Sequence, residues 1–275
     1  MSLLSNNVNF VKMRNNIINF FLIGFVILSS TAQNTVKTRF SVPTDFKRSN
    51  TNSTSFAYFL QNLPLKKAGS HVKLYTGIYK SHEVYDAVID LPIGTKDLHQ
   101  CADAVMRLRA DYLYNQKKNS EIHFNFTNGF RVDFSKWILG FRIKIKGNKA
   151  FWSKTAAPAS DYKSYWEYME TVFQYAGTAS LEKELKPQNL EDLQIGDVFI
   201  KGNFPGHAVI VIDKAINSKT KKIVFMLAQS YMPAQDLQVL KNMKNKSISP
   251  WFELNIDSNL ETPEWTFSYL QIKSF

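Results

Sequence analysis

The chain has 275 residues, of which 44% are hydrophobic and 21% charged, with a single cysteine and a formal net charge of +11. This length suits one large domain or two small ones with a core that needs no disulfide, and the lone cysteine excludes a disulfide within the chain. The positive charge favours anionic surfaces such as wall polymers and lipid headgroups, whereas the lack of a basic block or binding motif argues against nucleic acid as a partner.

Residues 1–32 have the pattern of a cleavable secretory signal peptide. Lys12 and Arg14 precede the apolar run 16–29, and small residues follow it. This order is typical of an export signal. An uncleaved anchor is the less favoured alternative, because the run is shorter than the ~20 residues of a spanning helix. We therefore expect an exported protein, periplasmic or extracellular, with no stable membrane span after cleavage before Gln33.

The segment that follows is polar, and the folded domain begins after it. Residues 33–54 are rich in Ser, Thr and Asn without periodicity, which indicates a linker or a strap across the domain surface. Residues 55–275 are expected to form a single domain. A serine cap and helical spacing predict a helix over 55–63. Two β-type runs, 72–75 and 87–91, flank a glycine turn and suggest a pair of strands.

The cysteine lies near the start of the longest predicted helix. Apolar residues over 98–116 keep the helical period, and Asp97 is a good N-cap. Cys101 is thus expected about one turn inside the helix, where the dipole and free amides lower a thiol pKa. A buried, inert core cysteine is the alternative. Arg107 and Arg109 are expected to be solvated, with a role in a cleft for acidic peptide groups as the alternative.

The middle of the chain, about 121–187, mixes strands and helices. The Asn128-Gly129 pair between apolar residues predicts a tight hairpin, and residues 137–151 continue in β-like alternation. A helix is expected over 161–176, and a shorter one follows it. The aromatic residues of this helix are spaced for core packing, with stacking on sugar rings as the alternative.

The C-terminal third is predicted to be rich in strands. His207 begins an apolar strand after a loop that contains glycine and proline, and the next strand ends at Gln229 and Ser230. If the two strands pair as a hairpin, one of these polar residues lies beside the imidazole and can fix its tautomer. Gln229 is the preferred residue, and Asp213 lies too far along the strand.

These features resemble the NlpC-type papain-like cysteine peptidases, which cut peptide bonds of bacterial cell-wall muropeptides. The shared pattern is a cysteine near a helix start, a Gly-Asp pair before an apolar strand, a Gly-His pair at the next strand, and a closing polar residue. The resemblance implies Cys101 as nucleophile, His207 as base and Gln229 as the third polar residue. It also implies an α+β fold with a papain-like core, in which the nucleophile-bearing helix packs on an antiparallel sheet and an α/β subdomain is inserted at about 121–187.

The sequence departs from that peptidase pattern at the cysteine, where Gln-Cys-Ala-Asp replaces the usual Asp-Cys-Ser-Gly. The phrases QCADAVMRLRADYLY, VFQYAGTASLEKEL, PGHAVIVID and LAQSYMPAQD are more closely similar to an uncharacterised family of exported bacterial proteins, a domain of unknown function. This second resemblance implies no known activity.

We therefore expect an exported papain-like cysteine hydrolase, an amidase or endopeptidase whose partner is cell-wall peptide or another anionic envelope polymer. Backbone amides at the start of the cysteine helix would form the oxyanion hole. The alternative is a non-catalytic module that binds cell wall or glycan on the same scaffold. No metal or organic cofactor is expected, because His71, His82, His99 and His123 share no metal-ligand spacing.

Overall fold

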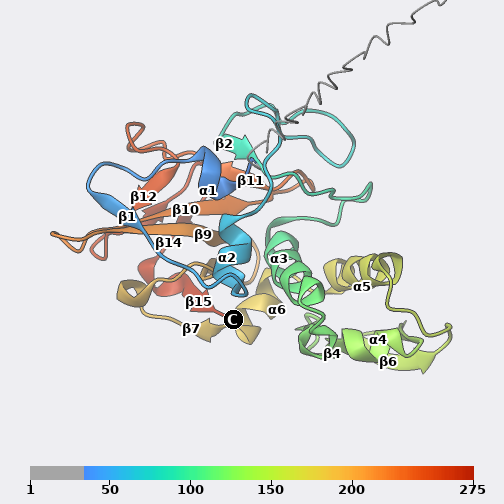
Figure 1. Ribbon diagram of the computed structural model, residues 1–275. Coiled ribbons are helices and arrows are strands. Elements are labelled where there is room, and N and C mark those ends of the chain that lie inside the picture. The colour runs from blue at the N-terminus through green and yellow to red at the C-terminus, as the bar shows by residue number, and fades with distance from the viewer. Residues whose placement is uncertain (1–33) are drawn as a thin grey trace, which may run out of the picture. The chain divides into compact units, whose positions relative to one another are not determined.

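The main sheet of the molecule is built from nine strands, all paired antiparallel (Figure 1). The computed structural model describes residues 34–275, so the predicted signal peptide lies outside the described residues. The strands along the main path of the sheet are, in spatial order, β2 (Tyr85–Val88), β11 (Gln238–Leu240), β10 (Ile223–Gln229), β9 (His207–Asn217), β8 (Val198–Lys201), β15 (Ile272–Ser274) and β7 (Lys186–Pro187). Two further strands lie off this path: β1 (Phe46–Arg48) pairs with β9, and β12 (Trp251–Glu253) pairs with β10.

Strand β9 is buried on both faces of the sheet. Ala208 and Ile210 belong to a core that the sheet shares with the helices, whereas Val209 and Val211 belong to a second core on the other face. Because successive side chains of a strand point to opposite faces, a strand with two buried faces is apolar throughout. This explains the continuous apolar run that follows His207.

Helices cover one face of the sheet, and short elements cover the other. The helices are α2 (Phe56–Gln61), α3 (Cys101–Asn115), α5 (Tyr162–Tyr175) and α6 (Thr178–Glu184). Helix α3 contacts β9, α5 and α6, and α5 lies on the side of α3 away from the sheet (Figure 1). The second core is formed largely by the sheet and by segments that contain η2 (Leu190–Asp192), β13 (Leu260–Glu261), β14 (Thr266–Phe267) and η3 (Tyr269–Gln271). The described chain is thus an α+β protein with a large antiparallel sheet.

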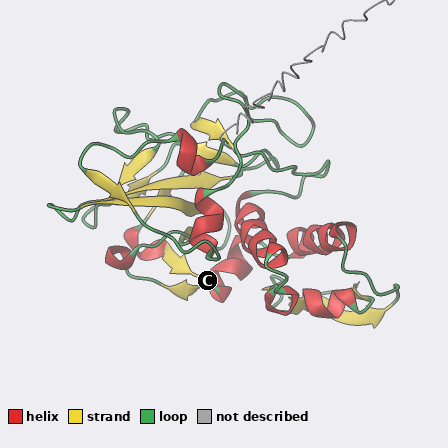
Figure 2. Ribbon diagram, viewed as in Figure 1, coloured by secondary structure: helices red, strands yellow, loops and turns green. Residues whose placement is uncertain are grey.

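The middle segment forms two small hairpins and a short helix. Its elements are η1 (Asn119–Glu121), β3 (His123–Asn125), β4 (Arg131–Asp133), α4 (Phe134–Ile138), β5 (Phe141–Lys146) and β6 (Lys149–Lys154). The hairpin predicted at Asn128-Gly129 is confirmed, with Gly129 at φ 85°. Figure 2 shows that the β5–β6 hairpin lies apart from the main sheet.

Two β predictions were wrong in their extent or partner. The β-like alternation predicted for 137–151 begins only at β5 and continues in β6, because Trp137 lies in α4 and its indole is buried against Tyr168. Residues 72–75 make only isolated bridges, and β2 pairs with β11 rather than with them. Local alternation does not specify which distant strand completes a sheet.

The predicted helices are present, but their ends differ from the predicted ones. Ser55 caps α2 through its hydroxyl, and Asp161 caps α5, as their positions in the sequence indicate. In α5, Tyr165 and Tyr168 are buried, which confirms the core-packing interpretation for them, whereas Tyr162 is exposed. Helices α5 and α6 share one core with α3 and the sheet.

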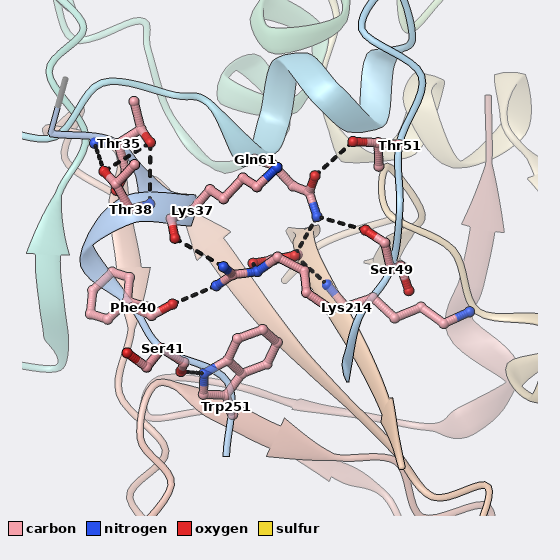
Figure 3. Close-up of polar contacts among 12 residues, drawn as sticks. Thr35, Lys37, Thr38, Phe40, Ser41, Ser49, Thr51, Gln61, Lys214 and Trp251 are labelled. Carbon is pink, nitrogen blue, oxygen red and sulfur yellow. Dashed lines mark hydrogen bonds and ion pairs between the residues drawn. The ribbon is translucent and has the colours of Figure 1, made fainter. Parts of the chain in front are cut away.

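Residues 34–54 include the short helix α1 (Val36–Arg39) and β1, and a buried carboxylate holds them to the sheet. Arg48 Nε donates to Asp213 Oδ2 at 2.8 Å, and Gln61 Nε2 donates to Asp213 Oδ1 at 2.7 Å. The guanidinium also donates to the carbonyl groups of Lys37 and Phe40, so α1 joins the same network (Figure 3). Asp213, buried on β9, thus has direct partners in two other segments, and Arg48 connects it to α1.

Candidate functional site

Cys101 is the first residue of α3. The N-cap is Gln100, whose backbone N–H donates to Asp103 Oδ2 at 3.0 Å. Asp97, predicted as the cap, instead accepts from the backbone N–H of Ala234 at 2.7 Å and so ties this loop to the one after β10. The helix therefore begins three residues later than expected, and the thiol lies at its N-terminus rather than one turn inside it.

The thiol of Cys101 is buried, with 8% of the residue exposed. Burial, followed by the nearby carboxyl of Asp103, raises its pKa to about 11, although the backbone amides of Ala102 and Ala208 act in the opposite direction. The expectation that the helix N-terminus lowers this pKa was wrong, because desolvation of the thiolate outweighs the amides. At neutral pH the sulfur is protonated.

His207 and Gln229 lie together at the end of the β9–β10 hairpin. The pairing of Leu227 with Val211 and of Ala228 with Ile210 sets the register. His207 Nε2 is 2.8 Å from Gln229 Oε1, and both residues are buried.

Ser230, the other polar residue considered for this place, does not contact the imidazole. Its hydroxyl lies 2.9 Å from the carbonyl oxygen of His99 and 2.8 Å from that of Gln235. It therefore joins loops on the α3 side of the sheet, and Gln229 alone of the two is the partner of His207.

Two residues that the sequence analysis missed, Glu264 and Lys80, hold Gln229 from the side away from His207. Gln229 Nε2 donates to Glu264 Oε2 at 2.5 Å, and Lys80 Nζ lies 2.7 Å from both carboxylate oxygens of Glu264. A carboxylate only accepts, so the amide nitrogen of Gln229 must face Glu264 and its oxygen must face His207. Consequently Nε2 of His207 carries the proton and Nδ1 carries the lone pair.

Aromatic rings surround the imidazole of His207. The ring centroids of Tyr231, Trp265 and Phe267 lie 5.0, 5.4 and 5.9 Å from it. Burial lowers the pKa of His207 to about 4, although the hydrogen bond to Gln229 and the charge of Glu264 oppose this shift. The imidazole is therefore neutral at neutral pH and can take up a proton in a reaction.

The three predicted site residues are brought together only in part, because the His207 ring packs against Phe267 in the second core, whereas Cys101 belongs to α3 on the other face of the sheet. The sulfur of Cys101 lies close to the backbone N–H of Ala208, the residue directly after His207. Within residues 34–275, no hydrogen bond joins Cys101 to His207. A cavity of about 350 Å³ is lined by Cys101 and Gly206, whereas only 1% of His207 is exposed.

The two arginines of α3 are not solvated charges. Arg107 is buried, with Nε 3.2 Å from Asp111 Oδ2 and its guanidinium 4.9 Å from the ring centre of Trp166. Arg109 packs over rings that include Phe56 at 5.2 Å. Neither arginine lines the cavity at Cys101. The expectation of a solvated charge was wrong for Arg107, because other segments fold over it, whereas Arg109 is only partly buried.

No group of three or more His, Cys, Asp or Glu residues suited to a metal ion occurs in the described part of the chain. His99, two residues before the cysteine, is buried with neither ring nitrogen in a regular hydrogen bond, and its ring packs edge-on against Phe173. Burial lowers its pKa to about 3, so it is a neutral core residue.

The fold and the buried polar site define an α+β protein with a helix-borne thiol beside a His–Gln hairpin. The family described as Domain of unknown function (4846) matches residues 36–274, and the chain belongs to this family. Comparison with curated proteins and with solved structures gives no match. Residues 34–275 contain no helix that is long and apolar enough to cross a membrane.

Proposed function

We propose that this protein is an exported cysteine hydrolase with a papain-like core that cleaves amide bonds, in cell-wall peptide or a related envelope polymer. The observation that carries the proposal is the hydrogen bond from His207 to Gln229, which leaves a basic Nδ1 on the residue next to the backbone amide that meets the thiol. A nucleophile, a base and a group that orients the base are the parts such a reaction needs.

The reaction would proceed from a neutral thiol and a neutral imidazole. Sγ of Cys101 forms a bond to the substrate carbonyl carbon while its proton moves to Nδ1 of His207, which requires the imidazole to turn from the second core toward the thiol when substrate binds. The imidazolium then gives this proton to the leaving amine as the C–N bond breaks. Water then adds to the thioester carbonyl while the same imidazole takes its proton. The C–S bond breaks, the acid is released and the proton returns to the sulfur of Cys101. The backbone N–H of Cys101, at the first position of the helix, can stabilise the oxyanion.

The pKa values of both groups favour general-base catalysis over a preformed ion pair. The pKa of the thiol is raised to about 11 and that of His207 is lowered to about 4, so the proton rests on sulfur before substrate binds. Proton transfer must therefore accompany the attack on the carbonyl.

A second candidate function is a non-catalytic module that binds a wall fragment or glycan on the same scaffold. It is favoured by the raised pKa of the thiol and by the lack of a Cys101–His207 hydrogen bond within residues 34–275. Catalytic hydrogen bonds are often long without substrate and tighten when it binds, so the two functions are separated by experiment.

The test is hydrolysis of purified peptidoglycan and its soluble muropeptides, followed by mass spectrometry of the products. The wild-type chain should release new carboxyl and amine termini, and both Cys101→Ala and His207→Ala should abolish the release. His82→Ala, which removes an exposed histidine, is the matched control and should keep full activity. Unchanged hydrolysis by Cys101→Ala would exclude the cysteine mechanism, and binding without hydrolysis by the wild-type chain would favour the second candidate.

A further inference from the structure

The cavity beside Cys101 has walls without positive charge. Among the described residues that line it, the ionisable side chains are Asp97, Cys101 and Asp103, and no lysine, arginine or histidine is present. The carboxylate of Asp97 is already engaged by the backbone of Ala234. Because two acidic residues and no lysine, arginine or histidine line this space, a carboxylate of a ligand meets no cationic side chain there.

Two exposed apolar side chains stand at the rim of the same cavity. Phe204 is 95% exposed and lies in the loop before β9, and Met232 is 51% exposed and lies in the loop after β10. These loops leave the hairpin at the end that carries His207 and Gln229. Apolar side chains this exposed gain free energy when a ligand covers them.

Asp103 provides a polar group without a partner at this cavity. The residue is 6% exposed, its Oδ2 accepts from Gln100, and its Oδ1 has no hydrogen-bond partner among residues 34–275. Burial raises the pKa of this carboxyl well above its usual range, although the backbone hydrogen bond from Gln100 opposes the shift, so burial favours the protonated form. A neutral carboxyl can donate its O–H to a carbonyl or amide oxygen, and a buried polar atom without a partner marks a place where a ligand can supply one.

We propose that the cavity beside Cys101 is the subsite for the acyl part of the substrate, and that it selects a neutral, apolar side chain over an acidic one. Phe204 and Met232 cover the apolar group from two sides, and Oδ1 of Asp103 hydrogen-bonds a neutral oxygen of the substrate. This inference rests on the proposed function. It narrows the substrate to peptides or amides with an uncharged apolar group next to the cleaved bond, although the chain as a whole is basic.

The test uses the lone cysteine as its own reporter. The folded chain is alkylated at about pH 9, where part of a thiol population is ionised, with N-benzyl-2-iodoacetamide or with its 4-carboxybenzyl counterpart. Each rate is measured by mass spectrometry and divided by the rate of the same reagent with the chain unfolded in guanidinium. The benzyl reagent should be favoured about tenfold over the carboxylated one, because the two differ only in a carboxylate that finds no cation in the cavity; tenfold corresponds to about 1.4 kcal/mol.

Rim variants decide whether the named residues cause the preference. Phe204→Ala and Met232→Ala should each reduce it about threefold, a loss typical of removing part of an apolar contact. Phe204→Lys should reverse it, because it adds a cation for the carboxylate. Leu270→Ala, which removes an exposed leucine outside the cavity lining, is the matched control and should leave the preference unchanged.

The results that would overturn this inference differ from those that would overturn the proposed function. Equal relative rates for the two reagents, or a preference that Phe204→Lys does not alter, would overturn the apolar subsite but not the proposed hydrolase activity. Undiminished hydrolysis by Cys101→Ala would overturn the hydrolase, and the subsite with it.

Discussion

The carboxylate of Glu264 accepts a hydrogen bond from the side-chain amide of Gln229 at 2.5 Å, and this bond decides which tautomer His207 adopts. Lys80, which is largely buried, holds the carboxylate in place through contacts of 2.7 Å to both oxygens. The base of the proposed reaction is thus oriented by residues far from it in the sequence.

Replacing Glu264 by Gln should loosen this orientation. A glutamine can either donate or accept, so the amide of Gln229 can turn over and present its nitrogen to the imidazole. We expect the ¹⁵N spectrum of His207 to change from a single Nε2–H tautomer to a mixture that includes Nδ1–H. Glu261→Gln, in an exposed ion pair, is the control. An unaltered tautomer in Glu264→Gln would show that the ring packing alone orients His207.

The buried His207 should make the fold less stable in acid. Its pKa is about 4 in the folded chain against 6.5 for the free side chain, so between these values the unfolded chain binds a proton that the folded chain does not. The free energy of unfolding therefore falls as pH is lowered from 6.5 to 4, by about 3 kcal/mol at most for this group. Urea unfolding of wild type and His207→Asn measures the effect.

The difference in the free energy of unfolding between wild type and His207→Asn separates the effect of the histidine from that of other titrating groups. Asp197, whose pKa burial raises to about 6, has the opposite sign, since the folded carboxyl takes up its proton at a higher pH than the unfolded one. It is present in both proteins and cancels. A pH dependence of stability that is identical in wild type and His207→Asn would contradict the lowered pKa.

Cys101 should destabilise the fold in alkali. Its thiol ionises near 11 in the folded chain and near 9 in the unfolded chain, so stability is complete below pH 9 and is lost as pH rises from 9 to 11. The loss is at most about 3 kcal/mol. Cys101→Ser, which does not ionise in this range, should lack it when the two unfolding curves are compared at pH 8 and pH 10.5. If the serine variant loses as much stability as wild type, the thiol is not shielded as described.

Breaking the Arg48–Asp213 pair should lower the free energy of unfolding more than breaking an exposed ion pair. Arg48→Met leaves the buried carboxylate of Asp213 without its countercharge and should cost about 3–5 kcal/mol. Adding Asp213→Asn removes the charge but keeps the oxygen that accepts from Gln61, and should restore a large part of the loss.

The exposed pair Lys244–Glu261 supplies the control for that measurement. Lys244→Met should change the free energy of unfolding by less than about 1 kcal/mol, since water screens both partners. Equal losses from Arg48→Met and Lys244→Met would mean that Asp213 is solvated rather than buried.

The sequence by itself determined the parts of this protein that depend on near neighbours along the chain. The turn at Asn128-Gly129, the cap and period of α5, and the meeting of His207 with Gln229 across one hairpin all follow from short-range geometry. Each needs only a few residues whose spacing is visible in the sequence.

Only the tertiary structure decided what depends on distant segments. Glu264 and Lys80 reach Gln229 from other parts of the chain, Arg107 is buried by residues that pack over α3, and β2 pairs with β11 rather than with its neighbour. The pKa of the Cys101 thiol is the clearest example. Its helix position predicts a lowered pKa, whereas burial raises it to about 11, because desolvation is set by the whole fold around a group and not by its place in a helix.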